Sequence, residues 1–376
     1  MTLALHWFLP TTGDSRALVG GGHSVPVDLA RGGGSGATAG RYREPDLAYL
    51  AQVARTAEQL GFDGVLTPTG TPCEDAWVVA SALIPQTERL KFLVALRPGL
   101  ISPTLLAQMS STFQRMSGNR LLLNVVVGGD PSEQLRFGDR VTKDDRYERA
   151  DEFLQVFRGA FDAAGIDFAG EHYDVVDART RAPAEVPRIY LGGSSAAAGP
   201  VTARQTDVYL TWGEPPAAVA EKIAWIRALA AEEGRDVRFG IRLHVITRDR
   251  SEDAWQIADR MLADLDPAEV AAAQDVLASS ESEGQQRMRD LHGGATTYAD
   301  ARQLEVHPGL WSGIGLVRSG AGTALVGSHV EVADLVEEYA SLGIDEFILS
   351  GYPHVEEAYW FAEGVMPLLR DRSLLA

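Results

Sequence analysis

The stretch "RFGIRLHVITRD", residues 238–249, sets an arginine and a histidine two positions apart within a run of strand-forming residues. Successive side chains of a strand point to opposite faces, so Arg242 and His244 share one face while aliphatic residues occupy the other. A guanidinium and an imidazole directed together into a pocket would bind an oxyanion such as a sulfonate, carboxylate or phosphate. The alternative is an ordinary half-exposed strand whose polar face meets water.

Arg318 is a third candidate for the same anion site. It lies in "VRSGAGTALVG", residues 317–327, whose glycine spacing is not the G-x-G-x-x-G of a dinucleotide fingerprint. A hinged lid that carries Arg318 fits this composition, and so does a plain flexible loop. Taken singly, each arginine more often pairs with one of the 52 carboxylates, and His244 alone is more often a hydrogen-bonded core residue.

A second constellation, "LGGSSAAAGPVTARQ" at residues 191–205, runs from a strand through glycines and serines into a helix. Gly193 lets backbone N–H groups approach a ligand, and the hydroxyls of Ser194 and Ser195 donate beside a helix N-terminus that favours phosphate. A simple turn with a serine N-cap is the alternative. A strand-to-helix junction late in a barrel is a frequent phosphate site, which favours the functional interpretation.

Other catalytic chemistries lack support in the sequence. The eight histidines show no H-E-x-x-H and there is no cysteine pair, so no metal site is predicted. There is also no G-x-S-x-G nucleophile elbow. The lone Cys73 is either a buried packing residue or a reactive thiol, and Trp212 and Tyr352 either pack in the core or cover a planar cofactor.

Eight β-rich runs alternate with amphipathic stretches along the chain. The predicted strands are residues 3–9, 64–68, 91–97, 121–127, 188–193, 208–212, 238–246 and 346–350. The predicted helices include residues 46–61, 103–118, 146–161 and 217–234, each of which ends near a glycine or a small polar residue. Eight strand–helix units favour a closed α/β barrel, the (β/α)₈ or TIM barrel, over an open Rossmann-type sheet.

The chain has 376 residues, whereas a plain barrel needs about 250. The excess predicts inserted loops within one domain that spans residues 1–376. One insertion is the Gly-rich stretch 19–44 after the first strand, which we expect to be mobile, and the other lies between strands seven and eight and includes a lid region at 279–328. Because active sites gather at the C-terminal ends of barrel strands, the polar residues at those ends are expected to meet.

The net charge and the composition limit the kinds of binding partner and the cellular location that we expect. A net charge of −18 repels phosphates at long range, so nucleic acid and anionic membranes are excluded as expected partners, and an anionic substrate needs local arginines. A single cysteine, the lack of an apolar run of membrane-spanning length and the lack of a signal-peptide pattern predict a soluble, cytoplasmic protein.

Seven segments together resemble the flavin-dependent alkanesulfonate monooxygenases of the bacterial luciferase-like superfamily. They are "FLPTTGDS", "GVLTPTGTPCEDAW", "LKFLVALRPGLISPT", "YLTWGEPP", "RFGIRLHVI", "GLVRSGAGTALVG" and "LSGYPHVEEAY". The resemblance runs from the first strand to about residue 360. It implies a (β/α)₈ barrel, usually dimeric or tetrameric, that takes reduced FMN from a separate NAD(P)H-dependent flavin reductase. It further implies oxygenation by O₂ at the C–S bond of an organosulfonate, with release of sulfite and an aldehyde, a desulfonation of sulfur metabolism.

The same resemblance assigns site residues. The positions that match the family's active site are Cys73, Trp212, Arg242, His244, Arg318, Tyr352 and His354. Those that match its flavin contacts are Asn124, Tyr147, Ser194 and Ser195, with Gly193 beside them. In this scheme the two arginines and His244 hold the sulfonate, and either Arg318 or Tyr352 supplies a proton.

Two departures bear on the substrate. Thr12 stands where the family's sulfonate enzymes have a pocket histidine, and Val127 stands where a threonine is usual. The substrate class therefore stays open between alkyl, aryl and sugar sulfonates. Alternatives are another organosulfur or heterocyclic compound, a deazaflavin-dependent oxidoreductase on the same barrel, and a flavin-binding protein without turnover.

Overall fold

The computed structural model describes residues 2–19, 42–181, 185–293 and 296–376. Eight parallel strands close into a barrel, and neighbours in the chain are neighbours in the barrel. They are β1 (Ala4–Phe8), β2 (Gly64–Thr67), β3 (Lys91–Leu96), β4 (Leu121–Val125), β7 (Ile189–Gly192), β8 (Val208–Trp212), β9 (Arg238–Arg248) and β13 (Glu346–Ser350). Pairing of β13 with β1 and of β8 with β9 completes the ring. The predicted (β/α)₈ barrel and its eight strands are confirmed.

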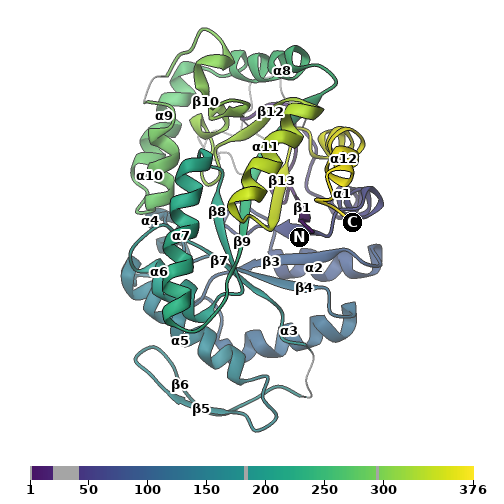
Figure 1. The fold of residues 1–376 in the computed structure, drawn as a ribbon. Coiled ribbons are helices and arrows are strands. Elements are labelled where there is room, and N and C mark those ends of the chain that lie inside the picture. The colour runs from purple at the N-terminus through teal and green to yellow at the C-terminus, as the bar shows by residue number, and fades with distance from the viewer. Residues whose placement is uncertain (1, 20–41, 182–184, 294–295) are drawn as a thin grey trace.

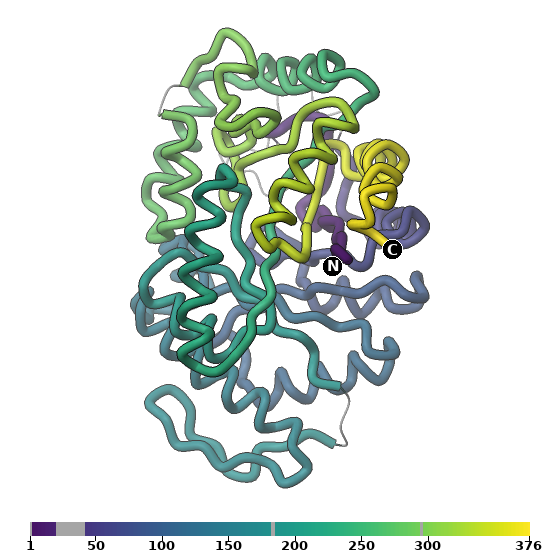
Figure 2. The backbone as a smooth tube through the Cα atoms, in the orientation of Figure 1, coloured from purple at the N-terminus to yellow at the C-terminus, as the bar shows by residue number. Residues whose placement is uncertain are grey.

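Helices surround the barrel on its outside (Figures 1 and 2). They are α1 (Leu47–Leu60), α2 (Ala76–Leu83), α3 (Pro103–Ser117), α5 (Lys143–Gly159), α6 (Ala198–Gln205), α7 (Pro216–Glu232), α11 (His329–Leu342) and α12 (His354–Asp371). Side-chain caps start several of them: Asp46, Asp75 and Ser102 each accept a backbone N–H of the first turn. No helix among the described residues combines the length and the apolar character that crossing a membrane requires.

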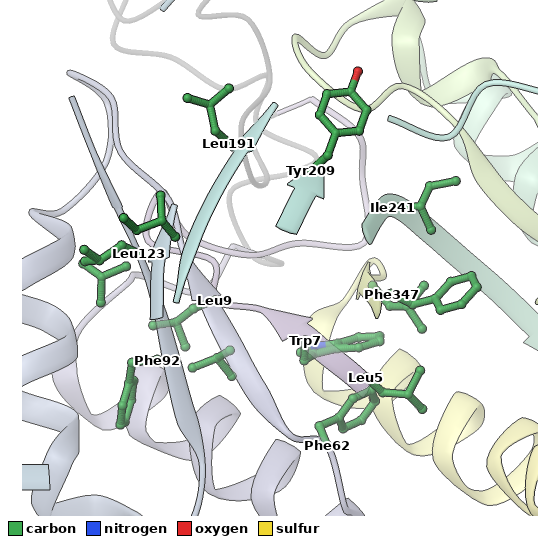
Figure 3. Packing of buried hydrophobic residues seen from close by; sticks show 14 of the residues in the cluster. Leu5, Trp7, Leu9, Phe62, Phe92, Leu123, Leu191, Tyr209, Ile241 and Phe347 are labelled. Carbon is green, nitrogen blue, oxygen red and sulfur yellow. The ribbon is translucent and has the colours of Figure 1, made fainter. Parts of the chain in front are cut away.

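Alternation along the strands separates two hydrophobic layers. Leu5, Trp7 and Phe347 belong to the large cluster between strands and helices (Figure 3). Phe8 and Ile348 belong to a smaller cluster inside the barrel. Successive side chains of a strand face the barrel interior and the helix layer in turn. A polar residue that faces the interior near the end of a strand therefore lies at the mouth of the barrel.

The excess chain length is built into ordered insertions. After β4 come α4 (Pro131–Arg136) and, beyond α5, a hairpin of β5 (Ile166–Ala169) and β6 (Asp174–Ala178). After β9 come α8 (Ser251–Ala263), α9 (Pro267–Ala278), α10 (Glu283–Asp290), β10 (Glu305–His307), β11 (Leu310–Trp311) and β12 (Ala324–Ser328). Three short 3₁₀ turns complete the chain: η1 (Ile84–Gln86), η2 (Ala301–Leu304) and η3 (Gly313–Leu316).

The region at 279–328 is a packed insertion with its own core. Trp311, Leu316 and Val326 contribute to a buried cluster there, together with residues of α8 and α9. Elements of two to eight residues have too few turns or alternations to show a period, which is why the sequence suggested loops. Of the other predicted insertion, 19–44, residues 20–41 lie outside the described residues, so the expectation of a mobile loop is not addressed.

Strand β9 extends two residues beyond its predicted end at residue 246. Its first half pairs with β8 and β13, and residues 244–248 pair in parallel with β12. Arg242 and His244 therefore lie in the middle of a long strand, where β12 takes over from β8 along one edge of β9, and not at the strand's end.

Candidate active site

A cavity of about 410 Å³ opens at the C-terminal ends of the barrel strands. Its volume lies within the range of small-molecule sites, roughly 300 to 1,000 Å³. Eight of the candidate residues line it: Asn124, Tyr147, Gly193, Ser194, Ser195, Trp212, Arg242 and Arg318. The insertion roofs it, because α10 and the segment 318–321 also contribute to its wall. The barrel and the insertion thus enclose one site.

Two arginines face this cavity without a carboxylate partner among the described residues. Arg242 donates to the Leu243 and Ile348 carbonyls and, at 2.8 Å, to the Ser350 hydroxyl. Arg318 donates to the Tyr352 hydroxyl. Both guanidiniums lie over the ring of Phe8, at 4.7 and 5.4 Å from its centroid. Burial, and then the charge of Arg318, hold the pKa of Arg242 well below its usual range. An anion in the cavity would relieve this unbalanced positive charge.

His244 is held in one tautomer by hydrogen bonds on both sides of its ring. Its Nδ1 lies 2.7 Å from the Ser350 hydroxyl, and its Nε2 lies 3.2 Å from the Ala321 carbonyl oxygen. A carbonyl only accepts, so Nε2 carries the hydrogen and Nδ1 accepts from Ser350. Burial, together with the charges of Arg242 and Arg318, keeps the pKa of His244 well below its ordinary value, so the ring is neutral. His244 does not line the cavity, and it acts on it through Ser350 and Ala321.

Tyr352 and His354 form a second layer behind the arginines. The Tyr352 ring stacks on His244 with centroids 5.5 Å apart and meets His354 edge-on at 5.6 Å. His354 is fully buried, and its Nδ1 lies 2.9 Å from Asp14, whose carboxylate also accepts the His354 backbone N–H. Burial alone raises the pKa of Asp14, but the contacts with His354 and Tyr49 more than offset it and lower that pKa.

Cys73 and Thr12 are not part of the cavity lining, although Cys73 adjoins it through Gly70 and Pro72. Burial raises the pKa of the Cys73 thiol to about 12, so the sulfur is protonated at neutral pH and a poor nucleophile. Thr12 uses its carbonyl to accept the Tyr42 hydroxyl at 2.8 Å. Neither residue has the geometry of a reacting group in this structure.

The Gly193–Ser195 segment forms a cradle at the opening of α6. A Cβ added at Gly193 would stand 2.7 Å from the Tyr147 hydroxyl and 2.6 Å from the Ala198 Cβ, so only glycine fits there. Burial raises the pKa of Tyr147, whose hydroxyl therefore stays a donor at neutral pH. A phosphate group suits this cradle. It could accept hydrogen bonds from the hydroxyls of Ser194, Ser195 and Tyr147, approach the backbone closely at Gly193 and lie near the N-terminus of α6. Apolar strand-end residues next to the cradle, including Leu66, Ala95 and Val127, suit a flat ring system.

The structure adds cavity residues that the sequence analysis did not assign. Arg97 lines the wall in an ion pair with Glu133, and two of its nitrogens, Nε and one terminal nitrogen, have no hydrogen-bond partner in the described chain. Lys222 pairs with Glu214 beneath Thr211. Arg97 was already placed at the end of a predicted strand, so its position gave a signal. Gln285, which also lines the cavity, lies in a polar stretch without periodicity, and nothing in the sequence marked it.

A family model described as luciferase-like monooxygenase matches residues 22–346. A riboflavin lyase with modified FMN and riboflavin shares the fold at 21% identity and a TM-score of 0.78, with 100% of this chain and 93% of that chain covered. A long-chain alkane monooxygenase shares the fold at 17% sequence identity and a TM-score of 0.77, with 100% of this chain and 93% of that chain covered. The protein DmoA from Hyphomicrobium sulfonivorans shares the fold at 20% sequence identity and a TM-score of 0.76, with 100% of this chain and 90% of that chain covered.

Proposed function

The chain belongs to the luciferase-like monooxygenase family, and within it we propose a two-component FMNH₂-dependent monooxygenase that cleaves the C–S bond of an organosulfonate. In balanced form, R–CH₂–SO₃⁻, FMNH₂ and O₂ give R–CHO, HSO₃⁻, FMN and H₂O. The products are thus sulfite and an aldehyde.

The observation that carries the proposal is the pair of buried arginines without a carboxylate. Arg242 and Arg318 are 7% and 5% exposed, and both line the cavity. A sulfonate stays anionic at any physiological pH and offers three oxygens, so it matches two guanidinium forks. Since the protein carries a net charge of −18, this local pair must supply the attraction.

The residues present fit a reduced flavin mononucleotide. Ser194, Ser195 and Tyr147 would hold its phosphate at the α6 cradle, and Asn124 and Val127 would border its ring system. Bound there with O₂, the flavin supplies the oxidising chemistry. In this proposal the chain's own residues bind the sulfonate, hold it beside the flavin and exclude water. The low exposure of Arg242, His244 and Tyr352 supports the exclusion of water.

Of the two proton donors considered for the reaction, we favour Tyr352, although Arg318 lines the cavity and Tyr352 lies behind it. Arg318 donates to the Tyr352 oxygen, which leaves the hydroxyl hydrogen of Tyr352 directed elsewhere. Arg318 in this scheme stays charged and bound to the sulfonate.

The remaining partners belong to the same proposal. A separate NAD(P)H-dependent reductase would deliver FMNH₂, and the protein would work as a homodimer or homotetramer in the cytoplasm. The organosulfonate class is favoured over other organosulfur compounds because two buried arginines without a carboxylate partner suit a full negative charge, which a neutral sulfone or thioether lacks.

The test is sulfite release from short alkyl, long alkyl, aryl and sugar sulfonates with FMN, NADH, O₂ and a generic flavin reductase. We expect sulfite only with the reductase present, and at least a hundredfold lower kcat/KM for Arg242→Ala, since an ionic hydrogen bond and its charge are both lost. Arg260→Ala, an exposed site on α8, is the matched control. Intact flavin binding without sulfite from any sulfonate would reject desulfonation. Activity would then be sought with other organosulfur or heterocyclic compounds, and with a deazaflavin in place of FMN.

A further inference from the structure

Gln285, the third residue of α10, reaches from the insertion into the cavity wall. It is 3% exposed and lines the cavity. Its Oε1 accepts the backbone N–H of Gly320 at 2.9 Å. Its Nε2 is buried and has no hydrogen-bond partner among the residues that the structure describes. Burying an amide whose two N–H bonds have no acceptor costs more free energy than a typical hydrogen bond contributes to stability.

The orientation of this amide is decided by its neighbour. The two ends of a glutamine side chain look alike, but the backbone N–H of Gly320 only donates, so the atom facing it is the oxygen. The other end is therefore the NH₂ group, and it can only donate. The partner of Nε2 must therefore be an acceptor, and the part of the chain that the structure describes supplies none.

The surroundings indicate which acceptor. Gly284, the preceding residue, packs against the Trp212 ring, and a Cβ added there would lie 3.6 Å from the Ser194 hydroxyl. On the other side, Gly320 follows Arg318 by two residues. Gln285 thus stands between the serine cradle and the arginine pair, two parts of the described cavity wall that offer hydrogen-bond donors to an anion.

We propose that Gln285 is a ligand-binding residue whose Nε2 donates to an anionic oxygen of the bound ligand, while its Oε1 fixes the segment that carries Arg318. The inference rests on the proposed function, which supplies two such oxygens: those of the substrate sulfonate and those of the flavin phosphate. No proton moves in this interaction, so the residue contributes to binding and specificity and not to bond breaking.

The decisive variant is Gln285→Glu, because a carboxylate still accepts from Gly320 while it replaces the donor with a negative acceptor. Binding would be measured at pH 8.5, to keep the introduced carboxyl ionised, by anaerobic titration of two ligand pairs. The first pair is 1-octanesulfonate and the neutral methyl octyl sulfone; the second is reduced FMN and reduced riboflavin. Gln286→Glu on the same helix is the control, since the exposed Gln286 side chain bonds only to Asp290 and Arg289 of its own helix among the described residues and does not line the cavity.

We expect Gln285→Glu to raise the Kd of one anionic ligand about tenfold or more and that of its neutral partner less than threefold. A selective loss for octanesulfonate assigns the donor to the sulfonate, and a selective loss for FMN over riboflavin assigns it to the phosphate. Gln285→Met, which removes the donor without adding charge, should weaken the same ligand and covers the case in which the glutamate variant does not fold.

Equal losses for charged and neutral ligands, or no change relative to Gln286→Glu, would overturn the assignment. If wild-type protein binds octanesulfonate in this titration and releases sulfite from it in the aerobic assay with the reductase, the failure is confined to Gln285. Wild-type protein that does neither would reject the proposed function and the inference with it.

Discussion

At the scale of single residues, the site depends on one hydroxyl that serves two partners. Ser350 is fully buried at the end of β13, accepts from Arg242 and donates to His244. This arrangement orients the guanidinium of Arg242 and helps to fix the tautomer of His244. Arg318 carries a like charge nearby, so holding the two guanidiniums in this fixed geometry without an anion raises the free energy of the folded state.

Ser350→Ala is therefore expected to lower kcat/KM for the sulfonate about tenfold or more while flavin binding changes little, because an ionic hydrogen bond contributes roughly 1.5 to 3 kcal/mol. Steady-state kinetics and an anaerobic flavin titration would measure the two effects. Ser312→Ala is the control, a buried serine that bonds to the Leu304 carbonyl within the insertion. Equal losses of activity in both variants would assign Ser350 to packing alone.

At the scale of elements, β9 joins the barrel to the insertion. Its N-terminal half pairs within the barrel, and its C-terminal half pairs with β12, so that the His244 N–H donates to the Thr323 carbonyl at 2.9 Å. The loop after β4 meets the other end of the insertion, because the Gly129 carbonyl accepts the Glu281 N–H and the Ser280 hydroxyl. The roof of the cavity is thus tied down at both ends.

The contact at Gly129 leaves no room for a side chain. An added Cβ would stand 2.7 Å from the Ser282 Cβ, so Gly129→Ala should push α10 away, speed amide hydrogen exchange over residues 281–290 and weaken flavin binding. Removing the opposing atom in Gly129→Ala/Ser282→Gly should restore slow exchange, since glycine replaces a serine N-cap at a cost of only a few tenths of a kcal/mol. Slow exchange in the single variant would show that the loop yields without moving the helix.

At the scale of the whole molecule, function and stability occupy opposite ends of the barrel. At the N-terminal end, the buried carboxylate of Glu346 contacts His6 at 3.2 Å, the Tyr190 hydroxyl at 2.7 Å and Arg188 at 3.1 Å. Burial by itself raises the pKa of Glu346, but these partners more than offset it and lower the pKa to about 2. This cluster lies far along the strands from the cavity and fixes the closure of β13 on β1.

The depressed pKa predicts an acid-sensitive contribution to folding. The ionised Glu346 stabilises the fold above its ordinary pKa of 4.5, and this contribution, about 3 kcal/mol, is lost as the pH falls towards 2. Urea unfolding between pH 6 and pH 3 should show the decline, and Glu346→Gln should be less stable at pH 6 and lose less on acidification. Glu148→Gln, at an exposed position of α5, is the control. A parallel decline in wild type and Glu346→Gln would place the acid sensitivity elsewhere.

The sequence by itself determined the barrel and one end of the site. Near-continuous apolar strands alternating with amphipathic helices define (β/α)₈ units, and strand alternation sets Arg242 and His244 on one face, because both periods are local properties of the backbone. The serine cradle followed equally from a strand, two glycines and a helix start.

Only the tertiary structure decided what those residues do. Both nitrogens of His244 are engaged by Ser350 and Ala321, partners 106 and 77 positions away in the chain. The roles of Gln285 and Arg97 depend likewise on which segments the insertion brings against the barrel. Contacts at such separations are set by packing of the whole chain, and no short-range pattern of residues encodes them.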